Sequence, residues 1–536
     1  MASPHRRRST RSTAGTTSRS TPGMSMQPPA ARNSWPDMAK RPAPTRNDPI
    51  AAELNTLAQA IKRKQYSAAL PRLTALRQKA PRDPRVLWML GVCNGELGRH
   101  AEAIEAYAAA VKADPKATPL RLSYIQALQR GGDYEQALLE AERLIYREPT
   151  NFHALRMRIS ILMDLARWDR AAELLAELRA SPVYQREPLS SRATLLISAA
   201  RLAPDHREPA EAIAELAPLA DDPSLIPAMR IPITWHLGRL HEAAGDYDTA
   251  FAYYKKSKEI DRLPWDPDDH ARRVDKLIEC WRPGCGIPFA DRDGSRLIFI
   301  LGMMRSGTSL TEQMLAQLDA IHPGGEMNAV SRQVAQSDPV FKGVLRPLPY
   351  TRANYTKQRI DAMASEAWTY YDAVSREGFV TDKQPYNYYY VPLIARLFPG
   401  CTIIHCSRDP QDTCLSNFFQ SFSRPHPQTH DLEWLGRYYR DYQRLMDAWR
   451  ALPELNIIEM PYEELVADPR GLLTPVLDRI GLPWDDAILN FHESDRAVRT
   501  SSRDQVRRPL YKSSVKKHER YAAHLAPLRR GLGLEE

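Results

Sequence analysis

A short glycine-bracketed loop carries the clearest chemical signal in the chain. The stretch LIFILGMMRSGTSLTEQML at residues 297–315 runs from an apolar segment through a turn rich in Gly, Ser and Thr into a helical pattern. Gly302 and Gly307 allow the backbone to curl so that several N–H groups converge on one anion, and the start of the next helix adds partial positive charge. Thr308 stands where a nucleoside-triphosphate loop has lysine, and the cation of this loop is Arg305. The loop therefore predicts an anion site that differs from that of a kinase or GTPase.

Three other segments place reactive side chains next to apolar runs. CTIIHCSRDPQDTCLSNFFQSF has Arg408 at the end of such a run and Ser416 eight residues later. HPGGEMNAV contains Glu326, and VTDKQPYNYYY contains Lys383. A carboxylate can take the proton of a reacting hydroxyl, and a lysine can offset charge on a leaving group. Taken singly, each has a plain structural interpretation, as an Arg-Asp turn before a helix or as a solvated surface charge.

The elements that must position these residues alternate between strands and helices. The runs RLIFILG, CTIIHCS and LNIIEM are apolar and partly β-branched, and helical stretches separate them. This alternation predicts a parallel sheet that is covered by helices on both faces. The loop at residues 302–309 belongs to the first strand-loop-helix unit of that sheet.

The first half of the chain repeats itself every 34 residues. The segments QYSAALPRL, RHAEAIEAY, DYEQALLEA and RWDRAAELL begin at Gln65, Arg99, Asp133 and Arg167. This period is typical of tetratricopeptide repeats, whose helix pairs stack into a solenoid. The pattern degenerates after about Ser181 and returns from Gly245. A concave face that binds a peptide or protein is one expectation, and an array that only packs against the other domain or dimerises the chain is the alternative.

Charge, hydropathy and cysteine spacing argue against a nucleic-acid-binding protein, a membrane-spanning protein and a zinc protein. Of the net charge of +9 over 536 residues, +8 falls within residues 1–46, so the remainder is nearly neutral and a broad nucleic-acid surface is not expected. The tail has almost nothing to bury, so we expect it to be disordered. An organelle transit peptide and a true start at Met24, Met26 or Met38 are both open. No apolar run approaches the ~18 residues of a membrane span. Six cysteines without zinc spacing favour a reducing, cytoplasmic location.

Together these motifs resemble the bacterial tetratricopeptide-repeat-containing sulfotransferases, whose catalytic half is similar to the tyrosylprotein sulfotransferases. The resemblance runs from about Arg296 to Tyr521, with the repeats covering most of the rest. It implies that the donor is PAPS (3′-phosphoadenosine 5′-phosphosulfate) and that no catalytic metal takes part. It assigns Arg408 and Ser416 to the donor's 3′-phosphate. It assigns the loop to the 5′-phosphosulfate, through Arg305, Ser306, Gly307, Thr308 and Ser309.

The same resemblance implies roles at the acceptor side. Glu326 matches the catalytic base of the tyrosylprotein branch, and His322 is a rival base because the small-molecule branch uses histidine. Lys383 matches a lysine that would stabilise the leaving group together with Arg305.

The resemblance also implies a closing loop over the nucleotide and a donor-site tyrosine. The tyrosine is Tyr462, and Lys517 is the expected phosphate contact of the loop. The other matched positions of the loop are Ser502, Gln505, Val506 and Pro509. Two positions depart from the tyrosylprotein pattern, since Gln420 replaces an arginine and His518 replaces a tryptophan.

The expected organisation is α + α/β, with an N-terminal tetratricopeptide solenoid before a P-loop-like α/β sulfotransferase domain that has a central parallel sheet. We place the disordered tail at residues 1–46, the repeats at 47–260, a linker at 261–295, the sulfotransferase domain at 296–525 and a C-terminal tail at 526–536. The expected activity is transfer of a sulfuryl group to an acceptor hydroxyl. The repeats favour a protein or peptide acceptor, while carbohydrates, lipids and secondary metabolites stay open. The rival readings are a P-loop kinase or nucleotide hydrolase, and a repeat scaffold with an inactive catalytic half.

Overall fold

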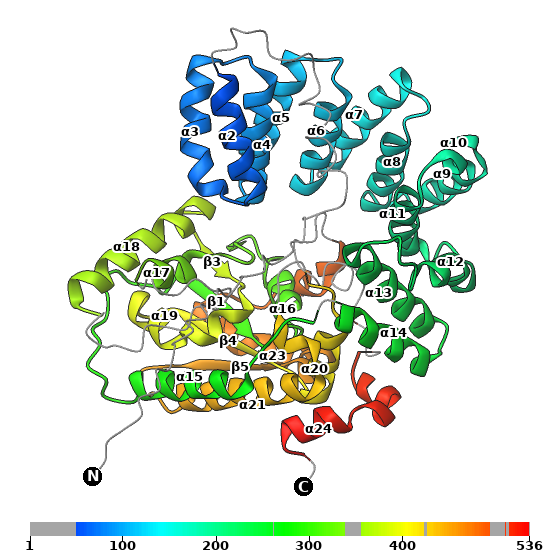
Figure 1. Ribbon diagram of the computed structural model, residues 1–536. Coiled ribbons are helices and arrows are strands. Elements are labelled where there is room, and N and C mark those ends of the chain that lie inside the picture. The colour runs from blue at the N-terminus through cyan, green and yellow to red at the C-terminus, as the bar shows by residue number, and fades with distance from the viewer. Residues whose placement is uncertain are drawn as a thin grey trace, which may run out of the picture.

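Antiparallel helix pairs fill the first half of the computed structural model, which describes residues 50–260, 262–337, 355–422, 426–493, 510 and 514–534 (Figure 1). The expected basic tail at residues 1–46 lies outside these ranges. The second helices of the first four pairs begin 34 residues apart, which confirms the predicted helical repeat. The pairs are α2 (Ala51–Lys62) with α3 (Tyr66–Lys79), α4 (Pro84–Glu96) with α5 (His100–Ala113), α6 (Thr118–Gly131) with α7 (Tyr134–Arg147), and α8 (Phe152–Asp164) with α9 (Trp168–Ala180).

The helical array continues where the sequence pattern degenerates. It consists there of α10 (Pro182–Arg186), α11 (Leu189–Ala199), η1 (Ala200–Leu202), α12 (Pro209–Leu216), η2 (Ala217–Leu219), α13 (Pro227–Ala243) and α14 (Tyr247–Ile260). Within the described ranges, none of the helices combines the length and apolarity needed to cross a bilayer.

The α4–α5 pair and the α13–α14 pair share a close glycine-tyrosine contact. Gly91 of α4 packs against Tyr107 of α5, and a Cβ at Gly91 would come within 2.7 Å of the tyrosine ring. Gly238 of α13 packs in the same way against Tyr254 of α14, where a Cβ would come within 2.9 Å. Helices can approach this closely only where a side chain is absent. The α13–α14 pair therefore has the packing of a complete repeat unit.

Five parallel strands form the sheet of the second half. They are β1 (Leu297–Gly302), β2 (Ile321–Pro323), β3 (Phe379–Asp382), β4 (Thr402–Ser407) and β5 (Ile457–Pro461), in the spatial order β2-β3-β1-β4-β5. The strand β1 pairs with β3 on one side and with β4 on the other. The chain therefore builds one half of the sheet before it crosses to the other half at the β1–β4 pair. In open parallel sheets, ligands bind outside the carboxyl ends of strands at such a switch point.

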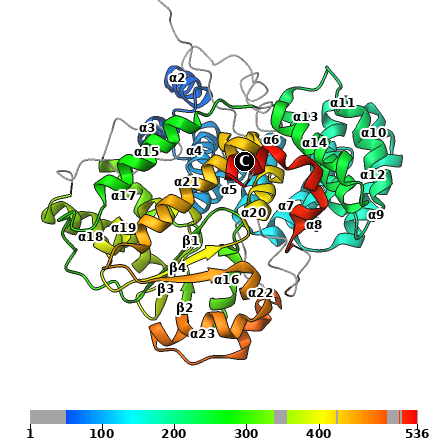
Figure 2. The same ribbon diagram turned by 90° about the horizontal axis from the view of Figure 1, so that it is seen from below.

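Helices cover both faces of the sheet, as predicted (Figure 2). One face packs against α16 (Thr308–Leu315) and α23 (Pro469–Ile480), through a core that includes Ile298, Ile300 and Ile404. The other face packs against α18 (Lys357–Val374), α19 (Val391–Leu397) and α21 (Leu432–Arg450). The remaining elements are α17 (Ala329–Ser337), η4 (Pro385–Tyr390), α20 (Pro410–Phe419), η5 (Pro427–His430), α22 (Tyr462–Ala467), η6 (Asp486–Glu493) and η7 (Lys517–His524).

The segments expected as a linker and as a C-terminal tail each contain a helix that packs on α21. The first, α15 (Pro267–Cys280), is joined to α21 by ion pairs that Asp268 and Asp275 form with arginines of α21. The second is α24 (Ala526–Leu532), whose Gly531 lies directly against the backbone of α21. Both helices contribute to the large core beneath the sheet, which also includes Phe251 of the last repeat.

Candidate active site

Every strand of the sheet leads directly or within a few residues into one of the predicted site residues. Glu326 follows β2, Lys383 follows β3, and the loop at residues 302–309 follows β1. Arg408 follows β4, and Tyr462 follows β5. Because the strands are parallel, their carboxyl ends lie at one edge of the sheet, and neighbouring strands are spaced ~4.8 Å apart. The strand order therefore places the predicted acid-base pair on one side of the loop and the predicted 3′-phosphate residues on the other.

The backbone of the loop adopts the conformations that its glycines allow. Gly302 has φ 147°, Gly307 has φ 103°, and Arg305 between them is also left-handed, with φ 72°. A Cβ at Gly302 would overlap the carbonyl oxygen of Cys406, and one at Gly307 would lie 2.9 Å from the ring of Tyr462. The hydroxyls that follow Arg305 are buried, and they belong to Ser306, Thr308 and Ser309. Side chains at Gly302 and Gly307 would therefore collide with the neighbouring strand end and with the Tyr462 ring.

Arg305 and Ser416 are in direct contact. The Arg305 Nε donates to the Ser416 Oγ at 3.0 Å, across the gap between the loop and α20. Arg408 lies beside them, since its Nη1 donates to the carbonyl of Arg305 at 3.4 Å. The guanidinium of Arg408 also stacks 4.9 Å from the centre of the Tyr462 ring. Four predicted donor-site residues are thus brought together at the β1–β4 switch point.

Two buried polar atoms in this group have no hydrogen-bond partner among the described residues. They are the Oγ of Ser306, whose residue is 1% exposed, and the Nε of Arg408. Buried polar groups are almost always paired, so an unpaired donor in a loop of this shape indicates a missing acceptor. A phosphate or sulfate oxygen is an acceptor of the required kind, and the residues present therefore fit an anionic donor nucleotide.

Lys383 and Glu326 form an ion pair at the other side of the loop. The Lys383 Nζ lies 2.9 Å from the Glu326 Oε1; the lysine side chain is 0% exposed, whereas that of the glutamate is 43% exposed. The backbone N–H of Lys383 also donates to the carbonyl of Gly325 at 2.9 Å, which holds the turn before Glu326 against the end of β3. The buried lysine therefore orients the Glu326 carboxylate, which is partly exposed to solvent.

The rival base His322 lies within β2, opposite Val380 of β3, and its ring reaches toward the start of β3. Its Nε2 is 3.2 Å from the point that a Cβ at Gly378 would occupy, and Gly378 immediately precedes β3. Lys383 immediately follows the same strand. The geometry groups Glu326, rather than His322, with the loop and the other predicted residues.

Sequence reasoning missed a buried carboxylate that supports Glu326. The Glu312 Oε1 accepts hydrogen bonds from the Gly325 N–H at 3.0 Å and from the Thr381 hydroxyl at 2.7 Å. Burial raises the pKa of Glu312, and the nearby ammonium of Lys383 opposes that shift. The sequence did contain a signal, since TSLTEQML places an acidic residue on the first helix after the loop. A charge on a helix that packs beneath a sheet is costly unless it is hydrogen-bonded or paired.

Beside this group lies a second buried carboxyl, Asp382. Its Oδ2 accepts a hydrogen bond from the Tyr371 hydroxyl at 2.8 Å. Burial raises the pKa of Asp382 to about 7, and the hydrogen bond from Tyr371 opposes this shift. The ammonium of Lys383 therefore lies among several carboxyl groups, of which Glu326 is the exposed one.

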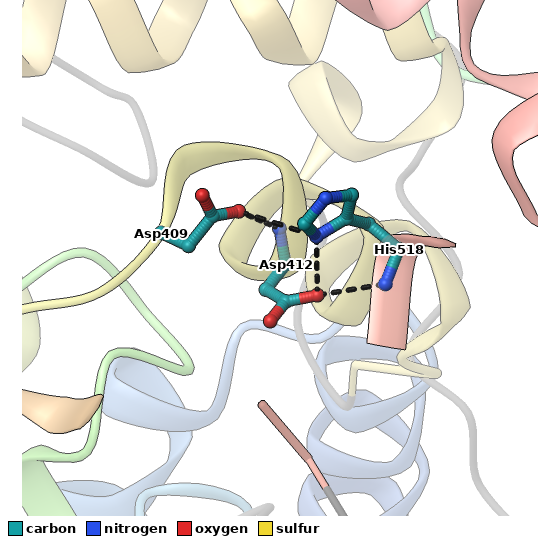
Figure 3. A group of neighbouring side chains, drawn as sticks. All are labelled: Asp409, Asp412 and His518. Atoms are coloured by element: carbon teal, nitrogen blue, oxygen red, sulfur yellow. Dashed lines mark hydrogen bonds and ion pairs between the residues drawn. The ribbon is translucent and has the colours of Figure 1, made fainter. Parts of the chain in front are cut away.

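The expected phosphate contact Lys517 is engaged elsewhere, in an ion pair with Glu242 of the last repeat. Next to it, His518 is tied to α20 (Figure 3). The Asp412 Oδ1 accepts from the backbone N–H of His518 at 2.8 Å and lies 3.0 Å from its ring Nδ1. The other oxygen of Asp412 accepts from the Lys516 N–H at 2.7 Å. Asp409, Asp412 and His518 are close enough to hold a cation, but these contacts already use both oxygens of Asp412.

Several predicted positions of the closing loop cannot be placed. Ser502, Gln505, Val506 and Pro509 lie outside the described residues.

Comparisons with known proteins distinguish the same two halves of the chain. Residues 297–486 match the model of the sulfotransferase family. Three tetratricopeptide-repeat models match residues 60–118, 96–159 and 233–262. The last of these covers the helix pair whose packing identifies it as a repeat unit.

Individual relatives match different shares of the chain. An uncharacterized protein of Aquifex aeolicus (strain VF5) is 29% identical over 430 residues, which cover 76% of this chain and 53% of that protein. This chain thus spans about half the length of that relative. Protein-tyrosine sulfotransferase 2 of Gallus gallus is 23% identical over 269 residues, covering 45% of this chain and 69% of that protein. Among solved structures, the sulfotransferase domain of the Synechococcus PCC 7002 olefin synthase matches 43% of this chain and 96% of its own, with 20% identity and a TM-score of 0.26.

Proposed function

From the premise that this chain carries a sulfotransferase-family domain behind tetratricopeptide repeats, we propose that it transfers a sulfuryl group from PAPS to an acceptor hydroxyl. The observation that carries the proposal is the convergence of Arg305, Ser416 and Arg408 at the β1–β4 switch point. The buried Ser306 Oγ and Arg408 Nε, which have no hydrogen-bond partner among the described residues, also belong to this region and favour an anionic ligand.

The donor nucleotide would be held by residues on both sides of the switch point. The loop amides with Arg305, Ser306, Thr308 and Ser309 would surround the 5′-phosphosulfate. Arg408 and Ser416 would hold the 3′-phosphate, for which a guanidinium offers a bidentate grip. The ring of Tyr462 lies against Arg408 and would limit the directions its guanidinium can take.

The acceptor hydroxyl would react at the Glu326 side. When bound, the donor supplies an activated sulfuryl group. The Glu326 carboxylate would take the hydroxyl proton as the new sulfur–oxygen bond forms. Lys383 orients that carboxylate, and with Arg305 it would offset the negative charge that passes to the departing phosphate oxygen when the old sulfur–oxygen bond breaks.

A protein or peptide is the acceptor class that the fold favours. Tetratricopeptide arrays expose extended surfaces that bind polypeptides, and this array lies above the catalytic half and reaches it at α13 and α14 (Figure 1). The carboxylate of Glu326 is open to solvent, so a hydroxyl on a large acceptor can approach it. The likeness to protein-tyrosine sulfotransferases supports the same class.

The test uses sulfur-labelled PAPS with the purified full-length protein in the presence of EDTA. Peptides, sugars and simple phenols serve as the acceptor panel. We expect label to appear on at least one acceptor without added metal, and to be lost with Glu326→Ala. Transfer or hydrolysis of the ATP γ-phosphate with magnesium, and no sulfur transfer, would contradict the proposal and favour a nucleotide kinase or hydrolase.

A further inference from the structure

The last repeat unit caps the helix that carries Ser416. The indole Nε1 of Trp235 on α13 donates to the carbonyl oxygen of Phe419 at 2.6 Å. The ammonium of Lys258 on α14 donates to the carbonyl oxygen of Gln420 at 2.8 Å. Phe419 ends α20 and Gln420 follows it, so both acceptors are carbonyls that the helix itself leaves unpaired. A cation at this place also interacts favourably with the negative end of the helix dipole.

The Lys258 side chain is buried at this contact. The residue is 8% exposed, and its Nζ also lies 3.4 Å from the Thr429 hydroxyl. Burial lowers the pKa of Lys258 to about 7. A lysine is costly to bury unless it is hydrogen-bonded, and Lys258 donates to two oxygens of the catalytic half.

Aromatic packing fixes the same end of α20. The ring of Tyr254 on α14 stacks on that of Phe419, with the ring centres 4.1 Å apart and the planes 18° apart. Phe251 stacks on Phe418 with the centres 5.8 Å apart. The last repeat and α20 therefore belong to one continuous core.

The same repeat unit also holds η7, the segment that contains Lys517. Glu242 of α13 pairs with Lys517 and accepts a hydrogen bond from the Tyr254 hydroxyl at 3.0 Å. At the far end of η7, the His524 Nε2 lies 2.7 Å from the Asp248 Oδ1. The repeat unit thus holds α20 and η7 in a fixed relation to each other.

We propose that the last tetratricopeptide unit helps to form the donor site, in which Trp235 and Lys258 position α20 for binding the 3′-phosphate and Glu242 positions η7. The inference rests on the proposed function, because α20 carries Ser416 and follows Arg408. These three residues are positioning residues, since none of them is placed in contact with the donor.

The test compares two ligands, adenosine 3′,5′-bisphosphate and adenosine 5′-phosphate, by isothermal titration of the full-length protein. A displaced α20 should affect only the ligand that has a 3′-phosphate. We expect Lys258→Met to weaken bisphosphate binding by about tenfold, as for the loss of one well-placed polar contact, and to leave adenosine 5′-phosphate binding unchanged. The conservative Lys258→Arg, which can still donate to the carbonyls, should retain most of the affinity.

Lys256→Met is the matched control. Lys256 lies on the same helix and pairs with Asp221 of the repeats at 2.6 Å, away from α20. We expect it to bind both ligands like the wild type. Trp235→Phe, which keeps an aromatic ring and removes the N–H donor, should reproduce the selective loss if Lys258→Met fails to fold.

The outcomes separate this inference from the proposed function. A wild-type protein that does not bind the bisphosphate would overturn both. Wild-type binding of the bisphosphate with unchanged affinity in folded Lys258→Met or Trp235→Phe would overturn the inference alone. An equal loss for both nucleotides would also overturn it, because that result indicates general destabilisation rather than positioning of α20.

Discussion

The ammonium of Lys383 is fully buried and reaches the partly exposed carboxylate of Glu326, with 2.9 Å between Nζ and Oε1. The pair joins the ends of two neighbouring strands, β3 and β2, at the edge where the anion-binding loop lies. A base held by a buried cation has a fixed orientation, and it keeps one face open for an acceptor. The predictions below follow from this pair and from the groups around it.

Replacing Glu326 should stop turnover without loss of donor binding. Glu326→Gln keeps the shape and removes the base, so we expect the rate of sulfur transfer from labelled PAPS to fall by about 10²-fold or more. His322→Gln is the matched control, because the His322 ring is directed toward the start of β3, away from Lys383, and the variant should retain the wild-type rate. Comparable losses in both variants would remove Glu326 from its assigned role.

Glu312 should act through the turn that carries Glu326. Glu312→Gln retains an oxygen that can accept from the Gly325 N–H and the Thr381 hydroxyl, so we expect it to lose less than tenfold in kcat. Glu312→Ala leaves both donors unpaired, and we expect about 10²-fold lower kcat with unchanged bisphosphate affinity. Steady-state kinetics beside titration calorimetry distinguish the two. Equal kcat in the Gln and Ala variants would contradict a positioning role.

Asp382 should make stability depend on pH in an unusual direction. Its pKa rises from an ordinary 3.8 to about 7, so between these values the folded state binds more protons than the unfolded state. The free energy of unfolding therefore falls as pH rises from about 4 to about 7 and levels off above it, as far as this group is concerned. Asp382→Asn resembles the protonated form and should have a flatter profile. Chemical denaturation at pH 5 and pH 8 measures the difference, and parallel profiles would contradict it.

Much of the fold was predictable because repeats and apolar runs in the sequence indicate it. The 34-residue spacing from Gln65 to Arg167 matches the helices in the structure, and the apolar runs around Ile298 and Ile404 form adjacent parallel strands. Helices α15 and α24 were expected as linker and tail. Their sequences carry helical signals, but only the packing against α21 shows that they belong to the catalytic half.

The donor-side residues of the candidate site were predictable because their motifs are local in the sequence. The loop around Arg305 and the Arg408–Ser416 spacing lie within single strand-loop-helix units, so their geometry follows from the chain nearby. Glu312 acts on a turn that the strand order brings to it, and Glu242 reaches Lys517 from a repeat far away in the sequence. Such contacts depend on tertiary packing, which spacing along the chain does not encode.

The central claim is that the switch point binds a nucleotide with a 3′-phosphate, and titration calorimetry with adenosine 3′,5′-bisphosphate, beside ATP with magnesium, tests it most directly. We expect micromolar binding of the bisphosphate, about −8 kcal/mol, that is lost in Arg408→Ala. It should be kept in Arg470→Ala, which removes an exposed arginine of α23. Tight binding of magnesium-ATP with no response to the bisphosphate would contradict the account.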